Sequence, residues 1–193
     1  MQDRRRRTRE ALLNEARKIV AEDGFDALRT EALAKAAGVA KGTVFAHFGD
    51  RDGLALAMTE DSLSRAAEAL DRPLPGPGAL VEALRPTMSL LTGDAGLWSA
   101  IQRVFCTPAP AGEEGCGPLL SWYVALGERI GAAIADMQAA GTARTDQPPA
   151  LLADGVLAFA LHLAQAQHAG LIPHDAARDA RMAALLGAWL AAP

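Results

Sequence analysis

The clearest structural signal in the sequence is LRTEALAKAAGVAKGTVFAHFGDRDGL, residues 28–54. Its first half predicts a short helix over 30–37, because leucine and alanine recur there at helical spacing. Gly38 follows as a residue suited to the left-handed conformation that ends a helix, and Val39 is expected to fill the turn. A second short helix is predicted over about 41–47. Two short helices joined by a glycine turn predict a helix-turn-helix.

The flanking sequence supplies the other helices that such a unit needs. Residues 8–23 place apolar side chains at i, i+4, i+7 and i+8, which makes one face apolar and the other charged. Thr8 is the expected N-cap of this helix, and Gly24 is expected to end it. A longer helix is predicted over 51–70, with Asp50 as its N-cap. The apolar stripe of the first helix consists of Leu12, Ala16, Ile19 and Val20.

The rest of the chain also predicts helices. Of the 193 residues 50% are hydrophobic but only 5% are aromatic. The hydrophobic share is mostly alanine and leucine, which favour helices over strands, so the expected fold class is all-α. Pro86 is expected to kink or split the first of the remaining helices. These are predicted at about 79–92, 95–106, 118–140, 148–170 and 175–191.

The segment RPLPGPG, residues 72–78, is the strongest break in composition. Its three prolines and two glycines disfavour a continuous helix. We therefore expect a helix-turn-helix domain over 1–54, a connecting helix over 55–71, this segment as a linker, and a larger helical domain over 79–193.

Charge is distributed unevenly along the chain. The formal net charge is −4, yet residues 1–55 hold 11 Lys and Arg against 9 Asp and Glu, and the remainder holds 8 against 14. A basic start joined to an acidic remainder hints at a polyanion-binding module with a second part of another kind. No apolar run reaches the roughly 20 residues of a membrane-spanning helix, and the residues after Arg4–Arg7 do not form a secretion signal. We expect a cytoplasmic protein without a membrane partner.

The second short helix has the side chains that a DNA-reading helix needs. A helix that enters the major groove, about 12 Å wide, must present short side chains and hydrogen-bond donors near its N-terminus. Lys41 can donate to guanine O6 and N7 or to phosphate, and Thr43 can offer its hydroxyl to phosphate or its methyl group to thymine. Gly42 lets the backbone approach closely. These three residues are the predicted centre of a recognition helix.

The pattern of residues 8–54 closely resembles the DNA-binding domain of the TetR family of transcriptional regulators. The resemblance implies a homodimer that binds double-stranded DNA, with phosphate contacts from His47 and Arg51. Beyond about residue 65 only length and helical character agree with the ligand-binding and dimerisation domain of that family. The resemblance is carried by Gly24-Phe25, Leu33-Ala34, Ala37-Gly38-Val39, Gly42-Thr43, His47-Phe48, Arg51 and Leu54.

Other residues near the predicted turn are further candidates for DNA contacts. Thr30 combines a hydroxyl with a helix N-terminus, a favourable phosphate site. Glu31 stands where the family sometimes has a base-contacting cation, and could accept from cytosine N4. Phe45 replaces the usual tyrosine and so loses its phosphate bond; its ring edge is expected against the sugar–phosphate backbone. Arg4–Arg7 is either a solubilising tail or a flexible arm that adds salt-dependent attraction, in a minor groove.

The C-terminal part predicts a small-molecule pocket through scattered candidates. A few polar groups among apolar walls are typical of such a pocket, although each residue taken alone fits a packing role better. Gln102 and His162 stand out, because a polar side chain among buried apolar neighbours needs a partner. The candidate pocket residues are Trp98, Gln102, Phe105, Trp122, Phe159 and His162.

The last two predicted helices are candidates for a dimer interface. The helix over 148–170 is apolar nearly all round, so it needs partners on more than one side. The helix over 175–191 has one apolar stripe, and two such neighbours from each of two copies would form a bundle. The candidate interface residues are Leu152, Val156, Leu163, Leu185 and Trp189.

No catalytic residue, metal ligand or cofactor site is expected. The sequence has no Ser/His/Asp order, phosphate-cradling glycine loop or His-Glu-x-x-His pattern. His162 and His168 are six residues apart and point about 120° apart on a helix, so they cannot share a metal ion. Cys106 and Cys116 flank a Gly/Pro/Glu loop and are expected to be inert thiols, with redox sensing as the alternative.

These observations predict a ligand-responsive transcriptional regulator that is not an enzyme. As a repressor it would bind a near-palindromic operator as a homodimer, and a small, mainly apolar effector would release it. Two alternatives remain open, which are a helical regulator or scaffold without a small-molecule ligand, and a thiol-sensing regulator.

Overall fold

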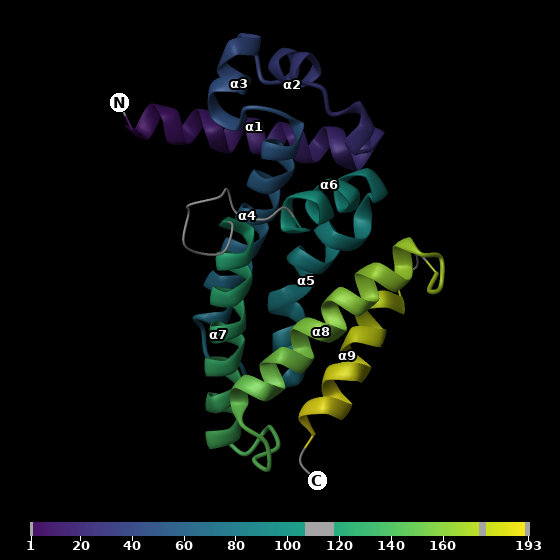
Figure 1. Cartoon of the computed structure of the whole chain (residues 1–193). Helices are drawn as coiled ribbons and strands as arrows, with labels where there is room; N and C mark the ends of the chain where they lie inside the picture. Colours follow the sequence, from purple (N-terminus) through teal and green to yellow (C-terminus); the bar gives the residue numbers. More distant parts are fainter. Residues whose placement is uncertain (1, 107–117, 174–176, 192–193) are drawn as a thin grey trace. The chain divides into compact units, whose positions relative to one another are not determined.

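The computed structural model describes residues 2–106, 118–173 and 177–191, and these residues form helices without strands (Figure 1). The expected all-α fold class is confirmed. The helices are α1 (Gln2–Asp23), the 3₁₀ turn η1 (Phe25–Ala27), α2 (Thr30–Ala36), α3 (Lys41–Phe48), α4 (Arg51–Leu70), α5 (Pro77–Gly93), α6 (Ala95–Cys106), α7 (Pro118–Ala139), α8 (Pro149–His168) and α9 (Ala177–Leu190).

The chain divides into two compact units. Unit 1 comprises residues 1–61 and 93–119, and unit 2 comprises residues 62–92 and 120–193. The first half of α4 therefore belongs to unit 1 and its second half to unit 2. This division differs from the boundary that composition suggests, because α6 belongs to the same unit as the helix-turn-helix.

Asp94 explains why α6 belongs to unit 1. One of its carboxylate oxygens accepts a hydrogen bond from the backbone N–H of Leu97 (2.7 Å), which caps the start of α6. The other oxygen accepts from the backbone N–H of Phe25 in η1 (3.1 Å). A single side chain thus fastens α6 to the end of the helix-turn-helix domain.

The helix-turn-helix forms as predicted. Gly38 has φ +65° in the turn after α2, and the N–H of Val39 donates to the carbonyl of Ala34 (3.0 Å), which closes the turn. Asp50 caps α4 as expected, since its carboxylate accepts from the N–H of Gly53 (2.8 Å). The core of this part is apolar and consists of Leu12, Leu13, Ala16, Phe25, Leu28, Leu33, Val44, Phe48, Leu54 and Met58.

The first helix begins earlier than the sequence suggests. It starts at Gln2, and the arginine run lies within it. Thr8 is therefore not an N-cap; its hydroxyl donates to the carbonyl of Arg4 one turn back (2.9 Å). Arg6 pairs with Asp3 (3.3 Å) and Glu10 (3.4 Å), the i, i+3 and i, i+4 contacts that support an exposed helix.

Unit 2 has an apolar core of its own between α5, α7, α8 and α9. Gly155 lets α9 approach α8, because a Cβ atom there would lie 2.5 Å from the Trp189 indole. The indole N–H of Trp189 donates to the carbonyl of Leu152 (3.0 Å), and its ring meets Phe159 edge-on at 5.6 Å. The core consists of Leu80, Leu84, Met88, Ile130, Ile134, Met137, Leu152, Val156, Met182 and Leu186.

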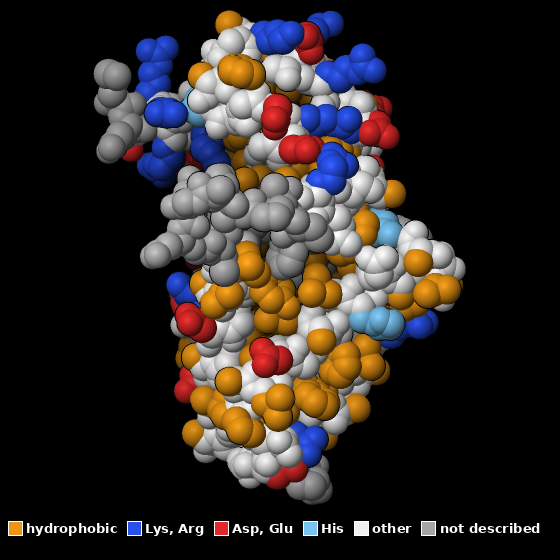
Figure 2. Space-filling view, viewed as in Figure 1, with side chains coloured by type: hydrophobic (Ala, Val, Ile, Leu, Met, Phe, Trp, Pro, Cys, Tyr) orange, Lys and Arg blue, Asp and Glu red, His pale blue; other side chains and the backbone are white. Residues whose placement is uncertain are grey.

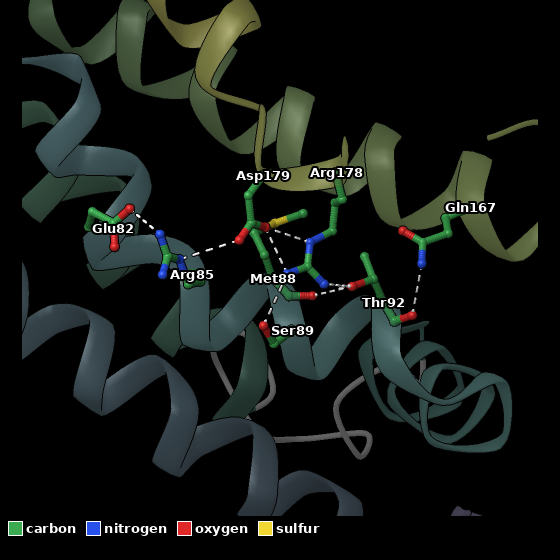
Figure 3. A network of polar contacts seen from close by, with 8 residues as sticks. All are labelled: Glu82, Arg85, Met88, Ser89, Thr92, Gln167, Arg178 and Asp179. Atoms are coloured by element: carbon green, nitrogen blue, oxygen red, sulfur yellow. Dashed lines mark hydrogen bonds and ion pairs between the residues drawn. The ribbon is translucent and has the colours of Figure 1, made fainter. Parts of the chain in front are cut away.

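A network of polar contacts joins the C-terminal end of α5 to α8 and α9 (Figure 3). Arg178 donates to the hydroxyls of Thr92 (2.7 Å) and Ser89 (3.2 Å). Gln167 donates to the Thr92 carbonyl (3.2 Å), and Nε2 of His168 lies 2.8 Å from the carbonyl oxygen of Leu91. Gln167 and His168 thus contact carbonyls that the last turn of α5 leaves without helical partners.

Pro86 does not split α5, which runs unbroken from Pro77 to Gly93. Pro86 is exposed, so water can bond the carbonyl that loses its helical partner. Among the described helices, α8 alone has the length and hydropathy of a membrane span. This property alone is weak evidence for a membrane span, since the core helices of soluble proteins share it.

Candidate nucleic-acid interface

The helix α3 buries one face and exposes the other. Val44 and Phe48 point into the core of unit 1. Lys41, Gly42 and Phe45 are exposed on the opposite face. The exposed face is therefore free to meet a partner, and it carries the side chains that the sequence singles out for DNA contact.

Two of the predicted DNA contacts meet each other in the structure. The ammonium group of Lys41 forms an ion pair with the carboxylate of Glu31 across the turn, and both side chains are 64% exposed. The hydrogen bond from Lys41 is also the main reason why the pKa of Glu31 lies below its ordinary value. Glu31 thus stays ionised and holds the lysine head group at the N-terminal end of α3.

The neighbouring positions of the exposed face leave room for a duplex. A Cβ atom on Gly42 would meet nothing within 4 Å, so packing within the protein does not require a glycine there. Phe45 is 66% exposed. Thr43 and Thr30 are half-buried, at the first turns of α3 and α2.

Arg51, predicted to contact phosphate, makes contacts within the protein, and its side chain is 42% exposed. Its guanidinium donates to the carbonyl of Phe25 (2.7 Å) and to the carboxylate of Asp26 (2.6 Å). It also stacks over the ring of Phe25, 4.3 Å from the ring centre. These contacts fasten the first turn of α4 to η1, and the sequence pattern gave no sign of them.

His47 lies beside a notch between α1 and α3. The notch has a volume of about 440 Å³. Burial is the main cause that lowers the pKa of His47 below its ordinary value, and the positive charges of Arg5 and Arg9 lower it further. The notch is lined by Arg4, Arg5, Thr8, Val39, Ala40, Thr43 and His47.

Arg9 is a residue of this region that sequence reasoning missed. Its guanidinium lies over the ring of Phe48, 5.5 Å from the ring centre, and pairs with the carboxylate of Glu60 (3.6 Å). Burial raises the pKa of Glu60, and the charge of Arg9 opposes that shift. Figure 2 shows lysine and arginine side chains gathered at the N-terminal end of α1.

The candidate pocket residues are not brought together in the groove that unit 2 offers. Trp98 is buried in unit 1, whereas Trp122 and Phe159 belong to unit 2. His162 is exposed, so the expectation that it needs a buried partner is wrong. Gln102 is half-buried in unit 1. The side chain of Phe105 lies outside the described residues.

The groove in unit 2 lies between α7 and α8 and has a volume of about 590 Å³. Its walls are mostly apolar, and Gly127 and Gly131 of α7 line it without side chains. Tyr123 lines it, with a pKa raised by burial and further by the charge of Asp154. The full lining is Tyr123, Val124, Gly127, Glu128, Gly131, Pro149, Ala150, Asp154 and Leu157.

Three of the five candidate dimer residues are buried in the core of unit 2. Leu152 and Val156 are fully buried and Leu163 is 2% exposed, so these three side chains pack within one chain. Leu185 and Trp189 are half-buried on α9. The apolar side chains that α8 does expose are Leu151 and Leu161, and Figure 2 shows exposed hydrophobic side chains on this part of the surface.

The described residues contain no group of three or more His, Cys, Asp or Glu that could hold a metal ion. Cys116 and the side chain of Cys106 lie outside the described residues. The structure therefore bears on neither thiol.

The fold and the exposed face of α3 define a helical protein whose N-terminal helix-turn-helix is built like those that bind DNA. Residues 12–58 match the family model described as bacterial regulatory proteins, tetR family. The N-terminal part of the chain is thus similar to the TetR family.

Individual proteins that are similar to this chain include transcriptional repressors. The HTH-type transcriptional repressor AcnR of Corynebacterium glutamicum is 32% identical over 83 residues, which are 43% of this chain and 42% of AcnR. The matched stretch thus spans about two fifths of that relative. The structure of SmeT, the repressor of the Stenotrophomonas maltophilia multidrug efflux pump SmeDEF, has a TM-score of 0.60 at 19% identity and covers 95% of this chain and 90% of SmeT.

A third protein shares the fold over nearly its full length. The transcriptional regulator FadR from Bacillus subtilis, in complex with stearoyl-CoA, has a TM-score of 0.62 at 15% identity. The match covers 94% of this chain and 97% of FadR. The likeness at this identity concerns the fold, and it extends beyond the helix-turn-helix into the helices of unit 2.

Proposed function

We propose that this protein is a cytoplasmic transcriptional repressor that binds double-stranded DNA through α3. The observation that carries the proposal is the exposed face of α3, because Lys41 and Gly42 are exposed at the N-terminal end of this helix and Thr43 beside them is half-buried. A helix of this kind fits the major groove, where lysine donates to guanine and a threonine methyl group contacts thymine. The match of residues 12–58 to the TetR family supports the same conclusion.

The pair of Lys41 and Glu31 affects how DNA would be read. In the free protein the lysine charge is offset by the carboxylate, which weakens non-specific attraction to phosphates. On a duplex the same carboxylate can accept from cytosine N4 while the lysine donates to a neighbouring base or phosphate. We expect the pair to favour some base sequences over others.

We further propose that two copies bind one near-palindromic site. Two recognition helices reach successive major grooves only when they are held about 34 Å apart, one turn of DNA. The exposed face of α8 is the proposed contact between the copies, because Leu151 (48% exposed) and Leu161 (36% exposed) lie on it around the small Ala158. A helix that keeps leucines exposed in one copy can bury them against a second.

The proposed effector is a small, mainly apolar molecule, and the groove between α7 and α8 is its candidate site. Such a ligand would release DNA by preferring a conformation in which the two recognition helices no longer match the half-sites. A preference of about 3 kcal/mol corresponds to a release of roughly 100-fold. FadR, which shares this fold, is in complex with stearoyl-CoA, a ligand with a long apolar acyl chain.

The experiment that tests the proposal is selection of bound duplexes from a random DNA library by the purified protein. We expect an enriched near-palindrome whose affinity falls steeply with salt. Binding without any sequence preference would contradict the proposal and favour a helical scaffold. A screen of apolar small molecules against the selected duplex would then test release.

A further inference from the structure

The notch between α1 and α3 has a composition that suits an anion. Arg4, Arg5 and Thr8 line it from one helix, and Thr43 and His47 line it from the other. No carboxylate is among its lining residues. Guanidinium groups and hydroxyls are the groups that proteins use most to hold backbone phosphates.

The volume of the notch is compatible with a hydrated phosphate. Its 440 Å³ corresponds to about 15 water molecules at about 30 Å³ each, so a phosphodiester group can enter together with part of its hydration shell. The notch adjoins Thr43 of the recognition helix, and a duplex bound to α3 would run past it. The arginines are helical here, which places them beside α3 instead of in an extended arm.

We propose that this notch binds one phosphate of the DNA backbone and that His47 takes up a proton when it does so. This inference rests on the proposed function, since it concerns the same interface. It assigns Arg4, Arg5 and Thr8 to that phosphate, and it makes DNA affinity depend on pH near neutrality.

The charges around His47 explain why a proton is taken up. In the free protein burial and the charges of Arg5 and Arg9 hold the pKa of His47 below its ordinary value, which favours the neutral ring. Arg9 cannot move away easily, because it is held over Phe48 and by Glu60 of α4. A phosphate offsets these positive charges and raises the pKa of His47. A pKa that is higher in the complex than in the free protein means tighter binding at lower pH.

The test measures the affinity for a fluorescein-labelled duplex of about 30 base pairs, three helical turns, by anisotropy at constant ionic strength. Between about pH 8 and about pH 6 the affinity is expected to rise roughly tenfold, within the limit of tenfold per pH unit for one proton. The variant His47→Gln keeps a hydrogen-bonding side chain but cannot titrate, and its affinity is expected to stay level over this range.

The matched control is His168→Gln, which removes a histidine of unit 2 whose Nε2 lies 2.8 Å from the carbonyl oxygen of Leu91. This variant is expected to keep the full pH dependence. The second variant is Arg5→Gln, which is expected to raise the pKa of His47 in the free protein and to lower the salt slope by about one. Ring resonances of His47, followed by NMR with and without the duplex, report its pKa directly and do not depend on a variant that folds.

The outcomes separate the inference from the proposed function. Binding that depends on salt but has the same pH dependence in wild type and His47→Gln would overturn the inference and leave the proposed function standing. An unchanged His47 pKa in the complex would do the same. A protein that binds no duplex at any pH would overturn the proposed function itself.

Discussion

Replacing Arg51 by alanine is expected to destabilise unit 1 and not merely to weaken DNA binding. In the structure this guanidinium joins α4 to η1 through the Phe25 carbonyl, the Phe25 ring and the Asp26 carboxylate. The sequence pattern instead predicts a phosphate contact. The two readings differ in what the variant does to the protein without DNA.

The expected loss in the free energy of unfolding follows from these three contacts of Arg51. A hydrogen bond from a charged group to a carbonyl contributes about 1.5 kcal/mol, and a guanidinium stacked on a partly exposed ring contributes about 0.5 to 1 kcal/mol. The pair with Asp26 adds little, because the Asp26 side chain is 90% exposed. We expect Arg51→Ala to lower the free energy of unfolding by about 2 kcal/mol.

Urea unfolding followed by circular dichroism measures this loss, and Arg51→Lys is the informative companion. Lysine keeps the charge but cannot stack a planar head group while it donates twice, so we expect this variant to be nearly as unstable as alanine. A phosphate contact predicts the reverse, with wild-type stability in both variants and most of the DNA affinity kept by lysine. That result would refute the structural role.

Two glycine substitutions give further predictions, with Gly187→Ala on α9 as a common control because a Cβ atom there meets nothing within 4 Å. Gly42→Ala is expected to fold at least as stably as wild type, since alanine is favoured in helices by about 1 kcal/mol. Its affinity for a selected duplex is expected to fall roughly tenfold in anisotropy measurements, because the added Cβ atom meets the groove. Unchanged affinity would contradict this prediction. Gly155→Ala is expected to lower the free energy of unfolding, measured in urea, by about 2 kcal/mol. The reason is that its methyl group displaces Trp189 and breaks the hydrogen bond from the indole to the Leu152 carbonyl. Stability equal to that of the control variant would refute this prediction.

The local parts of the fold could be predicted from the sequence, and the reason lies in short-range chemistry. Gly38 and Asp50 act on residues within one or two turns, so their effects on the helix-turn-helix and on α4 follow from residue type. The predicted start of the first helix at residue 8 is too late, although the contacts that stabilise the earlier start are local as well. The pairs of Arg6 with Asp3 and Glu10 have the spacing that stabilises a helix, and they were the available signal.

The contacts between distant residues could not be predicted in the same way. Arg51 turns toward Phe25, which is 26 residues away, and Asp94 reaches the same residue across 69 positions. The face that α8 buries was also beyond reach, because a helix that is apolar nearly all round gives no periodic signal. For that reason His162 was expected inside, whereas it is exposed, and Leu152 was expected at an interface, whereas it is in the core.

The most direct test of the central claim is to remove the two side chains through which α3 is proposed to read DNA. The double variant Lys41→Ala and Thr43→Ala is compared with wild type on a selected duplex and on one of scrambled sequence, after circular dichroism and sedimentation have shown the same fold and association state. We predict that the preference for the selected duplex disappears while weak, salt-dependent binding remains. Specific binding retained by the double variant would contradict the assignment of α3 as the recognition helix.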